Sequence, residues 1–273
     1  EWIWDGAIGP VREVHVWTTH AVWPQGVQRP KETPPVPETL DWDLWLGPAA
    51  YSDYHPNYCP FGWRACWDFG SGALGDMACH ILNPVFSALH LEYPVRVQGS
   101  STLVNTESAP QAEIVEYTFP KRKDLPKEVR VRMPEVKVFW YDGGMMPSRP
   151  EELADGLPIM EDGMGGCLFV GSKDKLICNL GGINPRLLSG RVPDVPETLR
   201  RVNGYKPGGI MDGPHEQDWI RACKEDPGNR VEPMSHFGMA GPFSEMVLMG
   251  VLAVRLQSLN RELQWDGEEM RFT

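Results

Sequence analysis

The sequence of 273 residues is short of basic side chains. It has 26 lysines and arginines against 37 aspartates and glutamates, which gives a formal net charge of −11 at neutral pH. A chain this acidic does not offer the positive surface that attracts nucleic acid or an anionic membrane. We therefore predict neither nucleic acid nor a membrane among its partners.

Long hydrophobic runs are also missing. No uninterrupted apolar stretch reaches the roughly 18 residues that a membrane span needs. The most apolar segment, residues 243–259, contains Glu245 and Arg255. We interpret it as part of a helix packed inside a globular domain.

Paired cysteines are absent as well. The six cysteines have no CxxC spacing and stand mostly among apolar residues: Cys59, Cys66, Cys79, Cys167, Cys178 and Cys223. We predict free, mostly buried thiols. A metal site built from His15, His20, Cys66 and His80 would match no closed zinc pattern, so we predict no metal. The chain begins at Glu1 without a methionine or an apolar leader, and we expect a piece of a longer protein whose compartment stays unknown.

The most informative stretch runs from Trp67 to Pro84 and reads WDFGSGALGDMACHILNP. Its apolar residues and those that follow recur at helical spacing: Leu74, Met77, Ala78, Ile81, Leu82, Val85, Phe86 and Leu89. Asp76 and His80 fall one turn apart on the opposite face. Pro84 lacks the N–H that would bind the carbonyl of His80, so either the helix bends there or that carbonyl finds another donor.

The rest of the chain alternates strand-like and irregular segments. Strands are predicted at residues 11–23, 95–104, 112–119, 129–133 and 136–141, and a hairpin at 167–171 and 175–180. Helices are predicted near 41–46, at 214–225 with Asp212 or Gly213 as the N-cap, and at 242–263. Residues 24–60, 142–163 and 181–213 are expected to be irregular. We expect the first of them to be an ordered excursion over the sheet, because it is rich in aromatics. The pattern predicts one α+β domain over residues 1–273, with a large, mostly antiparallel sheet.

Gly70, Gly72 and Gly75 match the dinucleotide fingerprint GxGxxG literally. That fingerprint needs a buried strand leading into the turn, and the preceding residues are broken by proline and glycine. We therefore interpret these glycines as a tight turn that lets the loop approach a ligand. An anion pocket without dinucleotide specificity is the alternative.

Six segments together resemble a known family. These are DGAIGPVREVHV at the start, GSGALGDMACHILNP, FVGSKDKLI, and the closing HEQDWIRAC, FSEMVLMGVLAVRL and LQWD. In this order they are similar to the C-terminal α/β domain of the Gfo/Idh/MocA oxidoreductases. The resemblance implies a sheet with helices on one face and a homodimer or homotetramer formed through the open face. It also implies NAD or NADP, bound mainly by an N-terminal Rossmann domain that this chain lacks, since no EKP motif occurs in it.

Within that family, Asp76 and His80 match the D-x-x-x-H pair. Histidine suits general acid/base chemistry, and we assign this role to His80; Asp76 would orient its imidazole or bind a substrate hydroxyl. The alternative is an ordinary pair of helix residues. Arg64 is a candidate for gripping hydroxyls or a carboxylate, or else forms a surface ion pair.

Further candidates surround this pair. Tryptophan rings stack on the C–H faces of sugars, which makes Trp17, Trp23, Trp63 and Trp67 candidates for substrate binding, with core packing as the alternative. His215 is a weaker substrate-binding candidate. Gly72 and Gly75 are candidates for contacts near the nicotinamide.

Three functions remain open at this point. The first is the substrate-binding half of an NAD(P)-dependent oxidoreductase that acts on a CH–OH group of a sugar, polyol or derivative, and that is inactive as a fragment. The second is a redox-assisted glycosidase that retains NAD. The third is a non-catalytic carbohydrate-binding or scaffold protein.

Overall fold

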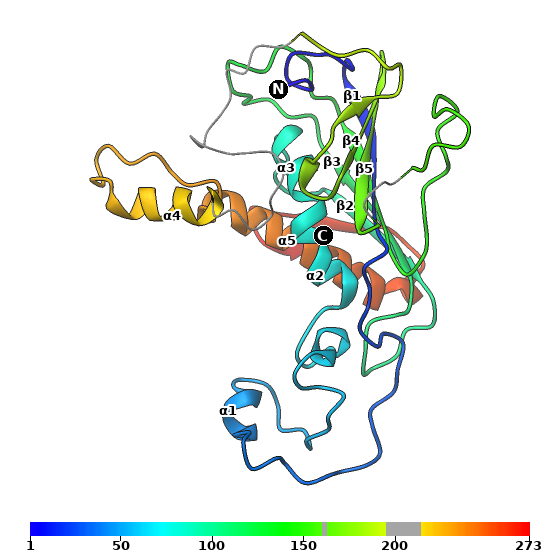
Figure 1. Ribbon diagram of the computed structural model, residues 1–273, viewed down its shortest axis with the longest axis vertical. Helices are drawn as coiled ribbons and strands as arrows, with labels where there is room; N and C mark the ends of the chain where they lie inside the picture. Colours follow the sequence, from blue (N-terminus) through cyan, green and yellow to red (C-terminus); the bar gives the residue numbers. More distant parts are fainter. Residues whose placement is uncertain (160–162, 195–213) are drawn as a thin grey trace.

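The computed structural model describes residues 1–159, 163–194 and 214–273, and its centre is a sheet of nine strands. The strand order is β7-β6-β5-β1-β4-β3-β2-β8-β9. β1 (Val11–Thr18) runs parallel to β4 (Val136–Tyr141), and every other pairing in the sheet is antiparallel. The large, mostly antiparallel α+β architecture is therefore confirmed (Figure 1).

Most of the predicted strands form where alternation is clear. β2 (Arg96–Ser101), β3 (Glu113–Phe119), β5 (Gly165–Gly171) and β6 (Lys175–Asn179) confirm four of them, and β5 and β6 form the expected hairpin. The strand predicted at 129–133 is wrong, because its backbone bonds elsewhere: Arg130 N donates to Trp4 O at 2.8 Å, and Met133 O accepts from Arg122 N at 3.1 Å. The short edge strands β7 (Arg186–Leu187), β8 (Leu263–Asp266) and β9 (Arg271–Phe272) were not predicted as strands.

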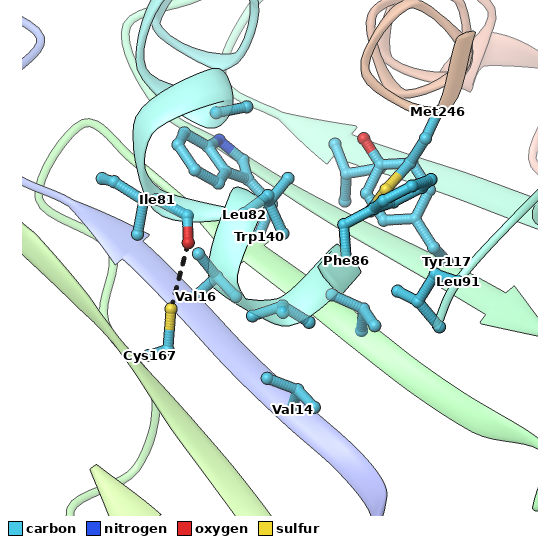
Figure 2. Close-up of a cluster of buried hydrophobic side chains, with 14 of the residues drawn as sticks. Val14, Val16, Ile81, Leu82, Phe86, Leu91, Tyr117, Trp140, Cys167 and Met246 are labelled. Carbon is cyan, nitrogen blue, oxygen red and sulfur yellow. Dashed lines mark hydrogen bonds between the residues drawn. The ribbon is translucent and has the colours of Figure 1, made fainter. Parts of the chain in front are cut away.

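The helices of the core cover one face of the sheet. Figure 2 shows Ile81 and Leu82 above Val16 of β1 and near Trp140 of β4, with Phe86 beside Tyr117 and Met246. The Sγ of Cys167 in β5 donates to the carbonyl of Ile81 at 3.2 Å, the dashed bond of Figure 2. These contacts fix the apolar stripe of the central helix on the sheet and leave its polar face outward.

Two prolines shape the helices. The predicted bend at Pro84 is a break, since α2 (Gly72–Ile81) ends before α3 (Asn83–Ala88), in whose first turn Pro84 lies. The predicted start of the last helix at Pro242 is wrong: α5 (Phe237–Arg255) begins five residues earlier and contains Pro242. By length and composition α5 is apolar enough to cross a membrane, but it packs on β2, β3 and α2.

Two further helices agree with the sequence. α1 (Trp42–Leu46) and α4 (Pro214–Lys224) lie where they were predicted. The N-cap proposed for α4, Asp212 or Gly213, lies outside the described residues. In Figure 1, α4 projects from the sheet.

The long excursion between β1 and α2 is ordered, as predicted. The expectation that it lies over the sheet is wrong, since it extends away from the sheet (Figure 1). It carries α1 and the 3₁₀ turn η1 (Gly62–Ala65). Trp42, Leu46 and Tyr58 form a small core of its own, against which Trp45 and Phe69 pack. The described part of the second irregular segment, 142–159, contains no helix or strand, also as expected.

The face of the sheet away from the helices carries pairs of polar side chains. His15 lies between Glu13 (2.7 Å) and the hydroxyl of Tyr141 (2.9 Å), and Lys137 pairs with Glu116. The apolar end of this face, around Trp17, is covered by side chains of the loops, such as Met146 and Ile159. In the described part of the chain, this face therefore combines polar pairs with an apolar end that the loops cover.

All six cysteines carry free thiols, as predicted. Only Cys167 and Cys178 are buried, so the expectation of mostly buried thiols is wrong. These two face each other across β5 and β6.

Candidate active site

The N-terminus of α2 is held by a buried glutamine that sequence reasoning missed. Gln25 Oε1 accepts a hydrogen bond from Ala73 N at 2.6 Å and another from Trp23 Nε1 at 2.9 Å. Its amide nitrogen donates to Pro110 O at 2.8 Å. Because Gln25 satisfies one of the unpaired N–H groups of the helix, it fixes the position of α2 relative to the excursion.

The three glycines that match GxGxxG lie close against other atoms of the protein. A Cβ at Gly70 would lie 2.4 Å from the carbonyl oxygen of Arg64, and one at Gly75 would lie 1.8 Å from Ser71 Oγ. Gly72 has a φ of +70°, and a Cβ there would lie 2.4 Å from the Cβ of Ala109. The segment before them is η1 and a turn, not a strand. At each of these positions a side chain would meet protein atoms, and no strand leads into the turn, so the dinucleotide fingerprint is not supported here. The assignment of Gly72 and Gly75 to contacts near the nicotinamide stays a prediction.

Arg64 joins η1 to the polar face of α2. Its Nε lies 3.2 Å from Oδ2 of Asp76, and both side chains are about one-third exposed (28% and 32%). The guanidinium carbon lies 4.7 Å from the ring centres of both Phe61 and Trp63, and Nη1 donates to Phe61 O at 3.2 Å. The structure thus brings three of the predicted residues together: Arg64, Asp76 and Trp63.

His80 lies one helical turn beyond Asp76 and is exposed. Among the described residues its imidazole has no hydrogen-bond partner, and no hydrogen bond joins it to Asp76. The predicted orienting of His80 by Asp76 is therefore not seen in this geometry. The imidazole is open to a ligand that lies along the polar face of α2.

The other predicted residues lie apart from this cluster, except Trp23. Trp23 is buried, and the Arg64 guanidinium lies 6.0 Å from its ring centre. Trp67 instead donates through Nε1 to Asn105 O at 3.1 Å and lies under Arg255.

Trp17 is fully buried on the face of the sheet opposite α2, because it alternates with Val14 and Val16, which face the helices. His215 is exposed on α4, the helix that projects from the sheet (Figure 1). We therefore leave Trp17 and His215 out of the candidate site.

A hollow of about 600 Å³ adjoins Trp63 on the side of the excursion. Its lining combines aromatic rings with one carboxylate: Trp45, Leu46, Pro48, Ala49, Trp63, Asp68 and Phe69. The density of aromatics before Phe69 was the only sequence signal for it. The rings come from α1 and from the segment around η1, and only the fold brings these two together.

A buried pair of carboxyl groups lies elsewhere, where β3 begins and β4 ends. Asp142 accepts hydrogen bonds from Glu113 N and Trp140 Nε1, both at 3.0 Å, and its side chain is hydrogen-bonded to that of Glu113. Burial raises the pKa of Asp142 to about 6. Burial and the neighbouring Asp142 charge raise the pKa of Glu113 well above its usual range. The two donors to Asp142 favour its ionised form, so Glu113 holds the shared proton.

Within residues 1–159, 163–194 and 214–273, no three His, Cys, Asp or Glu side chains gather closely enough to hold a metal ion.

Comparison with known proteins finds a family model that matches part of the chain. Residues 11–125 match the family model of the Gfo/Idh/MocA oxidoreductases described as "Oxidoreductase family, C-terminal alpha/beta domain". The matched segment contains Arg64, Asp76 and His80, and over these residues the resemblance predicted from the sequence is confirmed. No curated protein sequence matches the chain.

Solved structures of similar shape include three oxidoreductases. The WlbA dehydrogenase of Bordetella pertussis, in complex with NADH and UDP-GlcNAcA, is 13% identical, with 97% of this chain and 58% of that chain covered and a TM-score of 0.49. An oxidoreductase of Thermotoga maritima is 10% identical (97% and 56% covered, TM-score 0.47), and one of Sinorhizobium meliloti 17% (96% and 59%, TM-score 0.45). The chain spans less than two-thirds of the length of each, and we base no residue role on them.

Proposed function

We propose that this chain is the substrate-binding domain of an NAD(P)-dependent oxidoreductase that acts on a CH–OH group of a sugar, polyol or derivative. The family match to an oxidoreductase C-terminal domain supports this proposal. The turn before Gly70, where the dinucleotide fingerprint needs a strand, supports the view that the dinucleotide is held by a domain outside these 273 residues. Alone, the chain is then expected to bind substrate without turning it over.

The observation that carries the proposal is the imidazole of His80 on the exposed face of α2, which has no hydrogen-bond partner among the described residues. Histidine exchanges protons near neutral pH, and a group without internal partners is free to bond a substrate hydroxyl. His80 accepts the hydroxyl proton when the carbinol is oxidised and returns it in the reverse direction. NAD(P), when bound, supplies the hydride acceptor.

Arg64 and Asp76 position the substrate beside His80. The ion pair occupies Nε of Arg64 and Oδ2 of Asp76, and Phe61 O accepts from Nη1. Nη2 of Arg64 and Oδ1 of Asp76 have no partner in the described part of the chain. A donor and an acceptor held side by side suit a pair of neighbouring hydroxyls, as sugars and polyols present.

The experiment compares His80→Ala with His215→Ala in the longer protein that carries this chain. Reduction of NAD⁺ is followed with a panel of aldoses and polyols. General acid/base catalysis is worth about 10²–10⁴-fold, so His80→Ala should lower kcat by at least about 100-fold. His215→Ala, a matched change of an exposed histidine, should leave kcat unchanged. Wild-type turnover in folded His80→Ala would overturn the proposal.

A further inference from the structure

The hollow beside Trp63 is built on a rigid aromatic cluster. Trp45 stacks on Trp42 with ring centres 4.6 Å apart and an interplanar angle of 12°, and the edge of Phe69 meets Trp45 at 5.0 Å. Trp42 is itself anchored, since its Nε1 donates to Ser52 O at 2.8 Å. Trp45 is therefore held through one ring face and remains partly exposed where it lines the hollow.

The carboxylate of the hollow is also held in place. Oδ2 of Asp68 accepts from Nη2 of Arg29 at 2.9 Å, and Arg29 is bound in turn by Glu107. Asp68 Oδ1 has no partner in the described ranges. An immobilised carboxylate beside fixed indole rings offers one hydrogen-bond acceptor to a ligand that covers the rings.

Trp63 connects the hollow to the candidate active site. The Arg64 guanidinium lies over Trp63, and the same Arg64 forms the ion pair with Asp76. Arg64 therefore touches both Asp76 on the polar face of α2 and Trp63, and Trp63 lines the hollow together with Trp45 and Asp68.

Aromatic faces combined with an acceptor suit the chemistry of a pyranose ring. Such a ring has an apolar C–H face that packs on indole, and equatorial hydroxyls at its rim that donate to a carboxylate. The volume of the hollow lies within the usual range of about 300–1,000 Å³ for small-molecule sites. An open-chain polyol has no ring face that could pack on the fixed indole rings.

We propose that the hollow lined by Trp45, Trp63 and Asp68 is a second subsite that binds a pyranosyl ring. The substrate is then a disaccharide or a longer glycoside, with one unit at His80 and the next on the tryptophans. This inference rests on the function proposed above, and it names the substrate class of the same site.

The test fills the hollow without removing a contact. Ala49 lines it, and its neighbour Ala50 is exposed and does not, so Ala49→Trp and Ala50→Trp are a matched pair. The probes are methyl β-D-glucopyranoside, methyl β-D-galactopyranoside and methyl 2-acetamido-2-deoxy-β-D-glucopyranoside. Saturation-transfer-difference NMR on the chain reads their binding, and circular dichroism checks the fold of each variant.

We expect saturation of the ring C–H protons of at least one probe in the wild type and in Ala50→Trp. In Ala49→Trp, and in Trp63→Ala as a second variant should the first not fold, binding should be about tenfold weaker, as expected for lost stacking on aromatic rings. Absence of binding for every probe in the wild type, or equal binding in Ala49→Trp and Ala50→Trp, would overturn the subsite.

The same titration on His80→Ala separates the two proposals. Binding in the hollow should be unchanged, because His80 does not line it. If the hollow binds no sugar but His80→Ala strongly lowers turnover, only the subsite is refuted and the oxidoreductase proposal is retained. A hollow that binds sugar in a chain where His80→Ala has no effect on turnover would instead leave a carbohydrate-binding domain.

Discussion

Arg64 and Asp76 form an ion pair across the junction of the excursion and α2, with 3.2 Å between Nε and Oδ2. Arg64 belongs to η1 and lies on Trp63, while Asp76 lies one turn before His80 on the polar face of α2. The pair therefore holds the aromatic segment in place beside the candidate catalytic helix. Its position suggests that it orients ligand groups more than it stabilises the fold.

Replacing Arg64 should separate its role in substrate binding from its contribution to the stability of the fold. Exposed ion pairs contribute about 0–1 kcal/mol to stability, so Arg64→Gln should change the free energy of unfolding by no more than about 1 kcal/mol. The Michaelis constant for the substrate should rise by about tenfold, because a group that binds substrate through charge-assisted hydrogen bonds is lost. Denaturant unfolding and steady-state kinetics of the longer protein measure the two effects. A loss of several kcal/mol with unchanged kinetics would contradict the positioning role.

Stability should depend on glycine at position 72, because the protein around it leaves no room for a side chain. Gly72→Ala places a side chain both at positive φ and within 2.4 Å of Ala109, and we expect a loss of about 2–4 kcal/mol in the free energy of unfolding. Gly190 has a similar φ of +77° with open space around it, so Gly190→Ala is the control and should cost only about 1 kcal/mol. Equal costs for the two variants would show that contact with Ala109 is not what requires glycine.

Stability should depend on pH through Glu113 and Asp142. The pKa of each carboxyl is raised in the folded protein, that of Asp142 to about 6, so the native state binds more protons than the unfolded state. The free energy of unfolding should therefore fall as the pH rises from about 4 through 6 and beyond. Glu113→Gln keeps a donor for Asp142 and removes one ionisable group. It should flatten the decline, as measured by unfolding midpoints between pH 4 and pH 8, and an unchanged slope in this variant would contradict the assignment.

The open face of the sheet is the surface that we propose for self-association into a homodimer or homotetramer. Phe139 lies there, partly exposed and stacked on His15 with 5.2 Å between the ring centres. Phe139→Arg should shift the mass measured by light scattering towards the monomer. A monomeric wild type would contradict the proposal, as would an assembly that this substitution leaves intact.

Local patterns predicted the frame of the fold but not the packing between distant segments. Alternation of apolar residues located β1, β3 and β4, and Pro84 located the break between α2 and α3, because both are properties of a few neighbouring residues. Pro242 misled the prediction of α5, since a proline inside a helix costs one hydrogen bond and tertiary packing can offset that cost. The interaction of Gln25 with α2 joins residues 48 positions apart, and no local pattern reports it.

Part of the candidate site could likewise be predicted from local patterns, and part could not. The spacing of Asp76 and His80 placed both on the polar face of α2, because a helix fixes that geometry by itself. Trp17 is buried beneath loop side chains such as Met146 and Ile159, and these contacts between distant segments follow from no local pattern. Asp68 and Trp45 went unnoticed as ligand groups, since the hollow exists only where α1 meets the segment after η1.

Chemical rescue of His80→Ala by imidazole tests the central claim most directly. His80 is exposed, so its removal leaves a place that free imidazole can reach. In the longer protein, oxidation of the best substrate of the panel by NAD⁺ should fall by at least about 100-fold in His80→Ala. Turnover should then rise with the concentration of added imidazole, while the wild type should not respond. Wild-type turnover of the variant, or a loss of activity that imidazole does not restore at any concentration, would contradict the assignment of His80 as the group that moves the proton.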